Sequence, residues 1–533
     1  MTHFEFTVYS IDNLIRILIE KTETDEATIN AKLHTIYFKS YFKALDAKVI
    51  IVENYYIDRD FLEDYAGYYV SCYKTYKKKC TRLHFFNMEF TEDDYNNFIE
   101  GETSAVSGKK LQDSYLGFIV LKPLPKTIIG KTCLITYDKD NGRRNFPIVR
   151  KYEVNLFGIN LTVKSLAFQE QDHVVSACAT SSLWSVFHGS GILFQHPIPS
   201  PVDITKTACD HSMLETRYFP NNGLTLPQMA HAIKDVGLEP FLIRGTNIEV
   251  LQSTLYAYLS GGVPLLLGLF LVDMSAPGDV GLLKGKHAVA ITGYSIDSSH
   301  PKPFELSPIL LRGTRIDKIY AHDDQVGPFA RMVFDDREIE YLAGNQKRGP
   351  FRSLHTSWVG SDGKIGSIRA IPDMLLIPLY HKIRIPFETI FDLIITFDSF
   401  IEKMRVKGIL NIKQRLEWDI FLTTTNQFKT ALQIQEYEGA KLLSKKIRRR
   451  ILLENKPRFI WRAIAIVDEL EVMELLFDAT DIEQGLFLHR VIGYDQKLFD
   501  EFIEVSRDST LMSAIKEKPI WKILKWFSET KKV

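Results

Sequence analysis

The sequence predicts an α+β protein of several modules. Its 533 residues are 45% apolar, which is enough to build more than one substantial core. Runs of β-branched and aromatic residues typical of strands alternate with stretches whose apolar residues recur at helical spacing. We expect three parts: an N-terminal α/β module of unknown role at 1–160, a central module at 161–385, and a helical module at 386–533.

The first 160 residues mix both signals. Helical spacing is clear in 11–19, and a long helix rich in Tyr is expected from Asp58 to about Lys79. Strands are expected where β-branched and aromatic residues gather, at 48–53, 83–86, 115–121 and 131–137.

The central module begins with a cysteine that we expect at a helix N-terminus. Cys178 follows a polar run, and Leu183, Trp184 and Phe187 behind it fall at helical spacing. Unpaired N–H groups and the positive end of the helix dipole stabilise a thiolate there. The pattern therefore favours a nucleophile, although a small buried core cysteine is the plain alternative.

Two further residue types complete a candidate catalytic set. His287 opens the apolar run 287–294 after a Gly/Lys-rich segment at 281–286 that we expect to be a loop. Asp323 and Asp324 end the strand-like run 317–324. An imidazole can take and return a proton, and a carboxylate can hold the imidazole in the required tautomer. Either aspartate could serve, or both could be ordinary turn residues.

A polar donor is also needed for the oxyanion that forms during acyl transfer. Gln171 precedes the cysteine by seven residues and is the preferred candidate, with Gln169 as a rival.

These residues resemble papain-like cysteine peptidases. The order of Gln, Cys on a helix, the Gly-Leu-Thr unit at 223–225, an apolar strand, His-Ala-Val-Ala-Ile-Thr-Gly-Tyr and a strand ending in Asp is closest to the branch that processes double-glycine leader peptides. The resemblance covers roughly residues 165 to 380. It implies a papain-like fold, in which the cysteine helix packs on an antiparallel sheet.

The same resemblance implies roles for individual residues: Cys178 as nucleophile, His287 as base, Asp323 as orienting acid and Gln171 as oxyanion donor. Departures are Ala179 in place of the usual Gly and Asp324 in place of the usual Pro. Two readings follow: a thiol hydrolase of peptide, isopeptide or related amide bonds, or an inactive scaffold that binds proteins. Acyl transfer and deamidation could use the same Cys-His-Asp site.

The remaining expectations concern partners, location and the C-terminal part. Lys plus Arg and Asp plus Glu both total 66, so the sequence carries no strong nucleic-acid signal. The longest apolar run, 263–272, is too short to span a membrane. Sparse cysteines and no recognisable signal peptide predict a cytoplasmic protein. No metal-binding or nucleotide-binding motif is present, so we expect no cofactor or metal, and the peptidase resemblance implies a protein or peptide substrate. Helices are expected at 387–404, 418–423, 431–453, 459–477, 495–502 and 515–527, with a basic run at 445–450.

Overall fold

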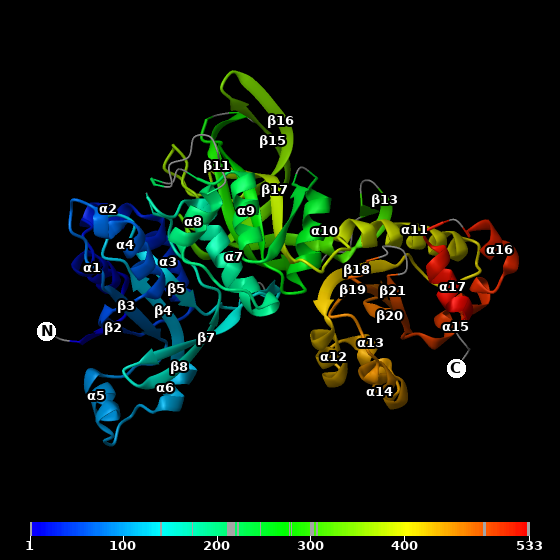
Figure 1. The fold of residues 1–533 in the computed structure, drawn as a ribbon, viewed down its shortest axis with the longest axis horizontal. Helices are drawn as coiled ribbons and strands as arrows, with labels where there is room; N and C mark the ends of the chain where they lie inside the picture. The colour runs from blue at the N-terminus through cyan, green and yellow to red at the C-terminus, as the bar shows by residue number, and fades with distance from the viewer. Residues whose placement is uncertain are drawn as a thin grey trace. The chain divides into compact units, whose positions relative to one another are not determined.

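The fold was analysed in a computed structural model (Figure 1). It describes the whole chain except residues 1–2, 139–140, 173, 211–218, 221–222, 246, 277, 279, 299–302, 305–306, 483–486, 517 and 530–533. Helices and antiparallel sheets are both abundant, so the predicted α+β class is confirmed. Across the described stretches, no helix combines the length and apolar character needed to cross a bilayer.

The contacts divide the chain into two compact units. Unit 1 comprises Met1–Thr246, Val263–Ser295 and Lys318–Pro378, and unit 2 comprises Asn247–Gly262, Ile296–Asp317 and Leu379–Val533. This grouping differs from the three predicted modules. The N-terminal 160 residues share a unit with the Cys178 region, and two central segments belong with the C-terminal part.

The N-terminal part of unit 1 is built on an antiparallel sheet in the order β1-β2-β3-β4-β5. Its strands are β1 (Phe4–Val8), β2 (Val49–Tyr56), β3 (Cys80–Phe86), β4 (Tyr115–Leu121) and β5 (Ile129–Leu134). Its helices are α1 (Ile11–Lys21), α2 (Glu26–Ala31), α3 (Leu33–Ala44), α4 (Arg59–Gly67), the 3₁₀ turn η1 (Tyr69–Ser71), α5 (Glu92–Glu100) and α6 (Gly108–Ser114). The strands expected in this region are all present.

The prediction of one long helix from Asp58 to Lys79 is wrong. Asp58 caps α4 by accepting from the N–H of Phe61, but the helix ends at Gly67. A Cβ on Gly67 would lie 2.7 Å from a methyl group of Val202, so this position requires a close approach between segments. The Tyr-rich residues beyond it form only the short turn η1.

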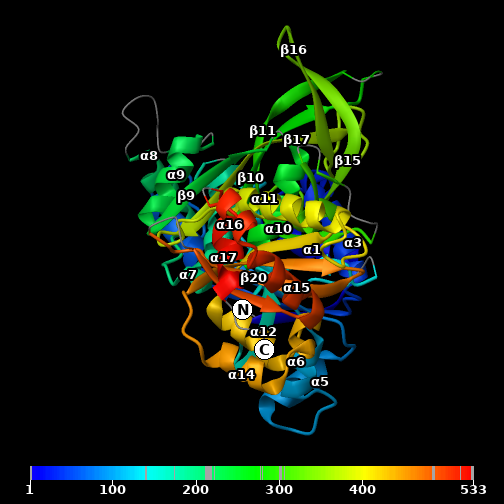
Figure 2. The same cartoon turned by 90° about the vertical axis from the view of Figure 1, so that its right-hand side faces the viewer.

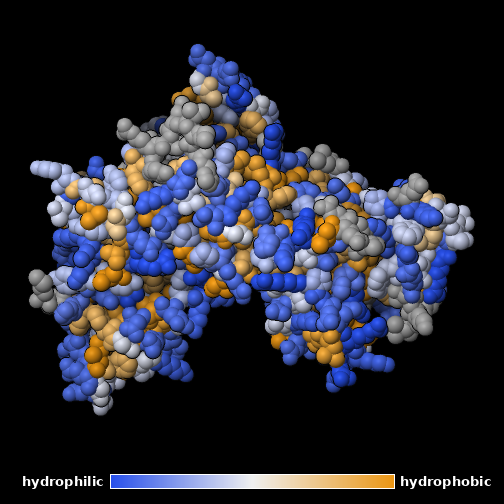
Figure 3. Space-filling model, in the orientation of Figure 1, coloured by the Kyte–Doolittle hydropathy of each residue, from blue (hydrophilic) through white to orange (hydrophobic). Residues whose placement is uncertain are grey.

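A second sheet of unit 1 closes on itself. Its order is β10-β11-β14-β15-β16-β17-β9, and β17 also pairs with β10. The strands are β9 (Leu238–Arg244), β10 (Leu265–Asp273), β11 (Val280–Ile296), β14 (Ile316–Asp323), β15 (Gly327–Ala343), β16 (Gln346–His355) and β17 (Ile368–Tyr380). The short strand β6 (Arg144–Asn145) pairs with β11, and β7 (Arg150–Leu156) with β8 (Ile159–Ser165) forms a separate hairpin. The β15–β16 hairpin projects from the sheet with a hydrophilic tip (Figure 3).

Three helices complete unit 1: α7 (Cys178–Phe194), α8 (Pro201–Cys209) and α9 (Leu226–Asp235). Most of α7 is buried, and it contacts α8 and β10. Helix α9 begins at a Thr225 capping box, as expected for the Gly-Leu-Thr unit, and lies beside α8 in both ribbon views (Figure 1, Figure 2).

Unit 2 is a six-stranded sheet in the order β12-β13-β18-β19-β20-β21, covered by helices. Its strands are β12 (Pro303–Phe304), β13 (Ser307–Leu311), β18 (Glu417–Thr424), β19 (Phe459–Val467), β20 (Leu470–Asp478) and β21 (Leu488–Gly493). Its helices are α10 (Ile248–Leu259), the 3₁₀ turn η2 (Arg312–Arg315), α11 (Phe387–Val406), α12 (Thr425–Ile434), α13 (Glu438–Leu442), α14 (Lys445–Leu453), α15 (Gln496–Ser506), α16 (Ser509–Ala514) and α17 (Trp521–Glu529).

The prediction of an all-helical C-terminal module at 386–533 is therefore wrong. Residues 418–423 form β18, and 459–477 form the β19–β20 hairpin. Strands β18 and β19 are almost wholly buried, so their side chains do not show the alternation with a period of two that marks a half-exposed strand. Helices are correctly predicted at 387–404 and 495–502. Of the described residues in the helix expected at 515–527, only those from Trp521 are helical, and the helix expected at 431–453 is divided among α12, α13 and α14.

Candidate functional site

Cys178 is the first residue of α7, as predicted. The residue before it, Ala177, has extended backbone angles and no side chain that could cap the helix. The first N–H groups of α7 are therefore not capped by the Ala177 side chain, and the cysteine is half-buried. This geometry favours negative charge on Sγ.

A carboxylate holds the turn that leads into α7. Asp172 Oδ1 accepts from the backbone N–H groups of Val174, Val175 and Ser176 at 2.7, 2.5 and 3.0 Å. Its Oδ2 accepts from the Tyr69 hydroxyl at 3.2 Å. The approach to the cysteine is thus tied both to its own backbone and to the N-terminal part of unit 1.

His287 lies within β11 and lines the same cavity as Cys178, close enough for the thiol to raise the pKa of the imidazole. The predicted loop at 281–286 is wrong, because β11 begins at Val280 and runs through these residues beside β10, where His287 is opposite Leu269. The imidazole is therefore held by a paired strand. Its Nε2 is 3.1 Å from Asp323 Oδ1, which leaves Nδ1 as the ring nitrogen for the thiol.

Asp323 is the last residue of β14 and is fully buried. Besides its bond to His287, Oδ1 accepts from the N–H of Gln325 at 3.2 Å, and Oδ2 accepts from Trp358 Nε1 at 2.7 Å. The Trp358 ring also packs edge-on against His287, with centroids 5.1 Å apart. Sequence reasoning missed Trp358, since an isolated Trp after a strand carries no motif.

Asp324 is buried beside the same imidazole. Its Oδ1 is 3.5 Å from His287 Nε2, and neither carboxyl oxygen has a hydrogen-bond partner among the described residues. Burial, with a contribution from the charge of Asp323, raises the pKa of Asp324 to about 7 in spite of His287. Its backbone carbonyl accepts from His34 Nε2 of α3 at 3.0 Å.

The electrostatics of the pair favour a charged imidazole. Burial by itself lowers the pKa of His287, but the charge and hydrogen bond of Asp323, the neighbouring Cys178 thiol and the charge of Asp324 together raise it well above its usual value. Burial raises the pKa of Asp323, yet His287 and the three hydrogen bonds outweigh it and hold that pKa below its usual value. Asp323 is thus the ionised partner and Asp324 the carboxyl that remains partly protonated near neutral pH.

A cavity of about 810 Å³ opens onto Cys178 and His287. Its wall is mainly apolar and comes from α9 and the residues 223–225 before it, and from β9, β10, β11 and β17, with three charged side chains. The apolar side chains are Leu224, Leu226, Met229, Leu242, Leu269 and Met374, and the charged ones are Arg244, Lys286 and Asp373. The thiol and the imidazole therefore share a hollow large enough for several residues of a peptide.

The two glutamines lie apart from this cavity. Gln171 lines a separate hollow of about 250 Å³ with Lys32, Glu170 and Gln325. Gln169 is buried, and its Nε2 has no partner in the described part of the chain. The oxyanion role of Gln171 therefore stays a prediction, with Gln169 still its rival.

One group of described side chains could offer three ligands to a metal ion. Atoms of His287, Asp323 and Asp324 lie within 4.8 Å of one another. His287 Nε2 is already directed at Asp323, however, so an ion would have to replace that hydrogen bond. The arrangement fits an acid–base pair with an additional carboxyl group.

Comparison with known proteins adds no family assignment. No protein-family model matches the chain, and no curated protein sequence matches it. The resemblance to papain-like peptidases therefore stays a prediction that depends on the residues described above.

Proposed function

We propose that this chain is a thiol hydrolase that cleaves peptide, isopeptide or related amide bonds through a cysteine acyl-enzyme. The observation that carries the proposal is that Cys178 and His287 line the same large cavity, while His287 is hydrogen-bonded to the buried Asp323 behind it. A nucleophile, a base and a residue that orients the base are the minimum set for this chemistry.

The residues would act in the following order. The Cys178 thiolate attacks the carbonyl carbon, and a C–S bond forms as the C–N bond breaks. His287 donates its proton to the departing amine. It then takes a proton from water, whose oxygen attacks the thioester; the C–S bond breaks, the acid is released and the Cys178 thiolate is restored beside the protonated imidazole. Asp323, held by Trp358 and Gln325, keeps the imidazole aligned throughout.

The cavity supports an extended polypeptide as substrate rather than a small metabolite. Its apolar wall suits side chains of a peptide, and the strands β9 and β17 pass beside it. Arg244 and Lys286 outnumber Asp373 among its charged groups, which favours substrates with an acidic residue near the cleaved bond.

An inactive binding scaffold is the second candidate. The observation that favours it is the position of Gln171, which lines a different hollow from Cys178. Loss of an oxyanion donor typically costs about 100- to 1,000-fold in rate. A chain without one would keep its cavity but lose most of its turnover.

Comparison of cellular polypeptides treated with the wild-type chain and with Cys178→Ala tests the proposal. We expect new peptide N-termini with the wild type and a loss on the order of 10⁴-fold with the variant, because no other group replaces the nucleophile. Circular dichroism would confirm that the variant folds, since Ala is well accepted at a helix start. Identical product patterns from the two proteins, or none from either, would refute a hydrolase. A mass gain of about 1 Da at Gln without cleavage would indicate deamidation through the same thioester.

A further inference from the structure

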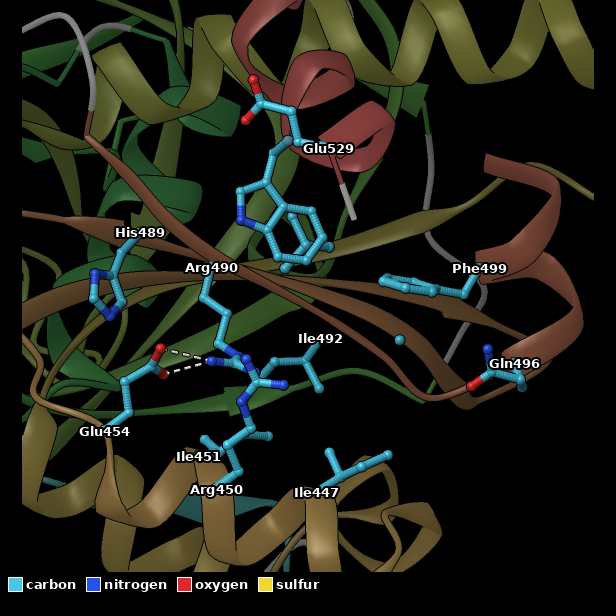
Figure 4. A pocket seen from close by; sticks show the side chains of 13 residues that line it. Ile447, Arg450, Ile451, Glu454, His489, Arg490, Ile492, Gln496, Phe499 and Glu529 are labelled. Carbon is cyan, nitrogen blue, oxygen red and sulfur yellow. Dashed lines mark hydrogen bonds and ion pairs between the residues drawn. The ribbon is translucent and has the colours of Figure 1, made fainter. Parts of the chain in front are cut away.

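A second cavity of about 590 Å³ lies in unit 2, along strand β21 (Figure 4). Five consecutive residues of this strand, 489–493, line it. The other lining residues come from α14 and its C-cap residue Glu454, from α15 and from α17. This groove, called the β21 groove below, contains none of the residues of the Cys178 site.

Strand β21 is the last strand of its sheet. It pairs with β20 only, and within the described part of the chain no backbone hydrogen bond reaches its other side. In an antiparallel edge strand, alternate residues direct N–H and C=O groups outward. Such an edge is a template for an additional strand.

The two sides of the groove differ in character. Arg490 and Ile492 face the layer of α12–α14, where Ile492 packs with Ile451. Gly493 faces the opposite layer, because a Cβ there would meet the ring of Phe499. Phe499 stacks edge-on with Trp526 at 6.3 Å, so that side offers an aromatic wall.

Cations outnumber carboxylates on the α14 side. Arg490 Nη1 contacts both oxygens of Glu454 at 2.7 Å, and Lys456 Nζ contacts the same carboxylate at 2.5 Å. One carboxylate thus serves two cations, and the Nε of Arg490 still has no acceptor among the described residues. Arg450 also lies on this wall, and it forms no ion pair with any described residue. The wall therefore carries uncompensated positive charge.

We propose that the β21 groove binds an extended segment of a partner protein in which acidic residues alternate with apolar ones. The segment adds a strand to β21 through main-chain hydrogen bonds. Because side chains of a strand alternate between its faces, its acidic residues reach Arg450 and Arg490 while its apolar residues pack on Phe499 and Trp526. This inference does not depend on the proposed hydrolase activity.

Single-stranded nucleic acid is the less suitable ligand. The phosphate groups of a nucleic-acid backbone are hydrogen-bond acceptors only, so they cannot pair with the outward carbonyl groups of β21. An extended peptide uses the donors and the acceptors of the strand edge alike.

Fluorescence anisotropy of the full-length chain with a labelled peptide of about ten residues tests the proposal, since this length spans the six residues of β21. The probe alternates Glu with Leu or Phe. We expect Arg450→Glu to weaken binding about tenfold or more through charge repulsion. Arg449→Glu makes the same charge change one residue away on α14, outside the groove, and should weaken binding less than about threefold. A peptide of the same composition with its acidic residues grouped together should bind more weakly than the alternating one.

Hydrogen exchange on the wild-type protein gives an independent measurement that needs no variant. The alternating peptide should slow exchange of amides in β21, whereas a version with Pro at every second position should not. The proposal is overturned if grouped and alternating peptides bind equally, if no binding occurs at millimolar peptide, or if both Arg variants lose affinity equally. Tighter binding of an oligothymidine, with no protection of β21, would assign the groove to nucleic acid instead.

Discussion

Asp324 has the most unusual environment of the residues around the candidate site. Its carboxyl group is buried without a hydrogen-bond partner among the described residues, and its pKa is raised to about 7, whereas a carboxyl group in an unfolded chain titrates near 4. Between these pH values the folded chain holds a proton that the unfolded chain has lost. The free energy of unfolding contributed by this group therefore decreases as the pH rises from about 4 to about 7.

Replacing Asp324 with Asn should remove this pH dependence. Relative to the wild type, the variant should become more stable as the pH rises from 4 to 7. The gain in unfolding free energy should be about 1.4 kcal/mol for each unit by which folding raises the pKa of Asp324. Urea denaturation at several pH values measures it. Asp323→Asn is the matched contrast. Because the pKa of Asp323 is lowered in the folded wild type, the stability that this carboxylate contributes is present at neutral pH and is lost only in acid. Parallel pH profiles for wild type and Asp324→Asn would contradict the account.

Some residues of the site could be predicted from the sequence and others could not. Cys178 at a helix start and Asp323 at a strand end follow from local periodicity, which the structure reproduces. Trp358 and Asp172 act through contacts that join distant segments, and nothing in their local sequence indicates this. Pairing of Gln171 or Gln169 with the thiol depends on the path of an irregular segment, which spacing alone does not determine.

At the scale of elements, the turn before α7 depends on Asp172. Its replacement with Ala would leave three N–H groups, those of buried Val175 and Ser176 and of half-buried Val174, without their acceptor. We expect a loss of about 1–3 kcal/mol in unfolding free energy, since each unsatisfied buried group carries a desolvation penalty. Asp172→Asn keeps one oxygen acceptor and should lose less. Chemical denaturation measures both, and a loss below about 0.5 kcal/mol for the Ala variant would show that the turn is held by other contacts.

The β19–β20 hairpin shows why the C-terminal strands were missed. Its turn uses Asp468 and Glu469, both with positive φ, of 49° and 63°. Hairpin turns of this kind usually contain Asn or Gly, which are the residues that mark them in a sequence. Without that signal, the apolar stretch 459–477 was indistinguishable from a helix, and tertiary packing decided its structure.

At the scale of the whole molecule, unit 2 combines segments that lie far apart in the sequence, and this affects where the chain can be truncated. Helix α10 precedes the C-terminal part by more than 100 residues, yet the hydroxyl of its Tyr258 accepts from the N–H of Phe387, and its ring packs on Trp461. Leu251, Leu255 and Leu259 of α10 are fully buried. These side chains are covered by elements that the predicted boundary at 385 would remove.

A chain ending at residue 385 should therefore be unstable. We expect it to aggregate or to bind a hydrophobic dye strongly, because the apolar face of α10 loses its cover. Size-exclusion chromatography and thermal unfolding measure this, and removal of residues 530–533 alone is the control for shortening the chain. A monomeric fragment with the unfolding temperature of the full chain would show that the part before residue 385 folds independently.

Alkylation of individual cysteines, followed by mass spectrometry at neutral pH, tests the central claim most directly. Cys80, Cys133 and Cys209 are buried with raised pKa values, and half-buried Cys72 is the comparison for exposure. If His287 activates Cys178, an electrophile should modify Cys178 at least about tenfold faster than Cys72, and His287→Ala should remove the difference. Equal rates at Cys178 and Cys72 in the wild type, or a rate at Cys178 unchanged in His287→Ala, would contradict an activated thiol.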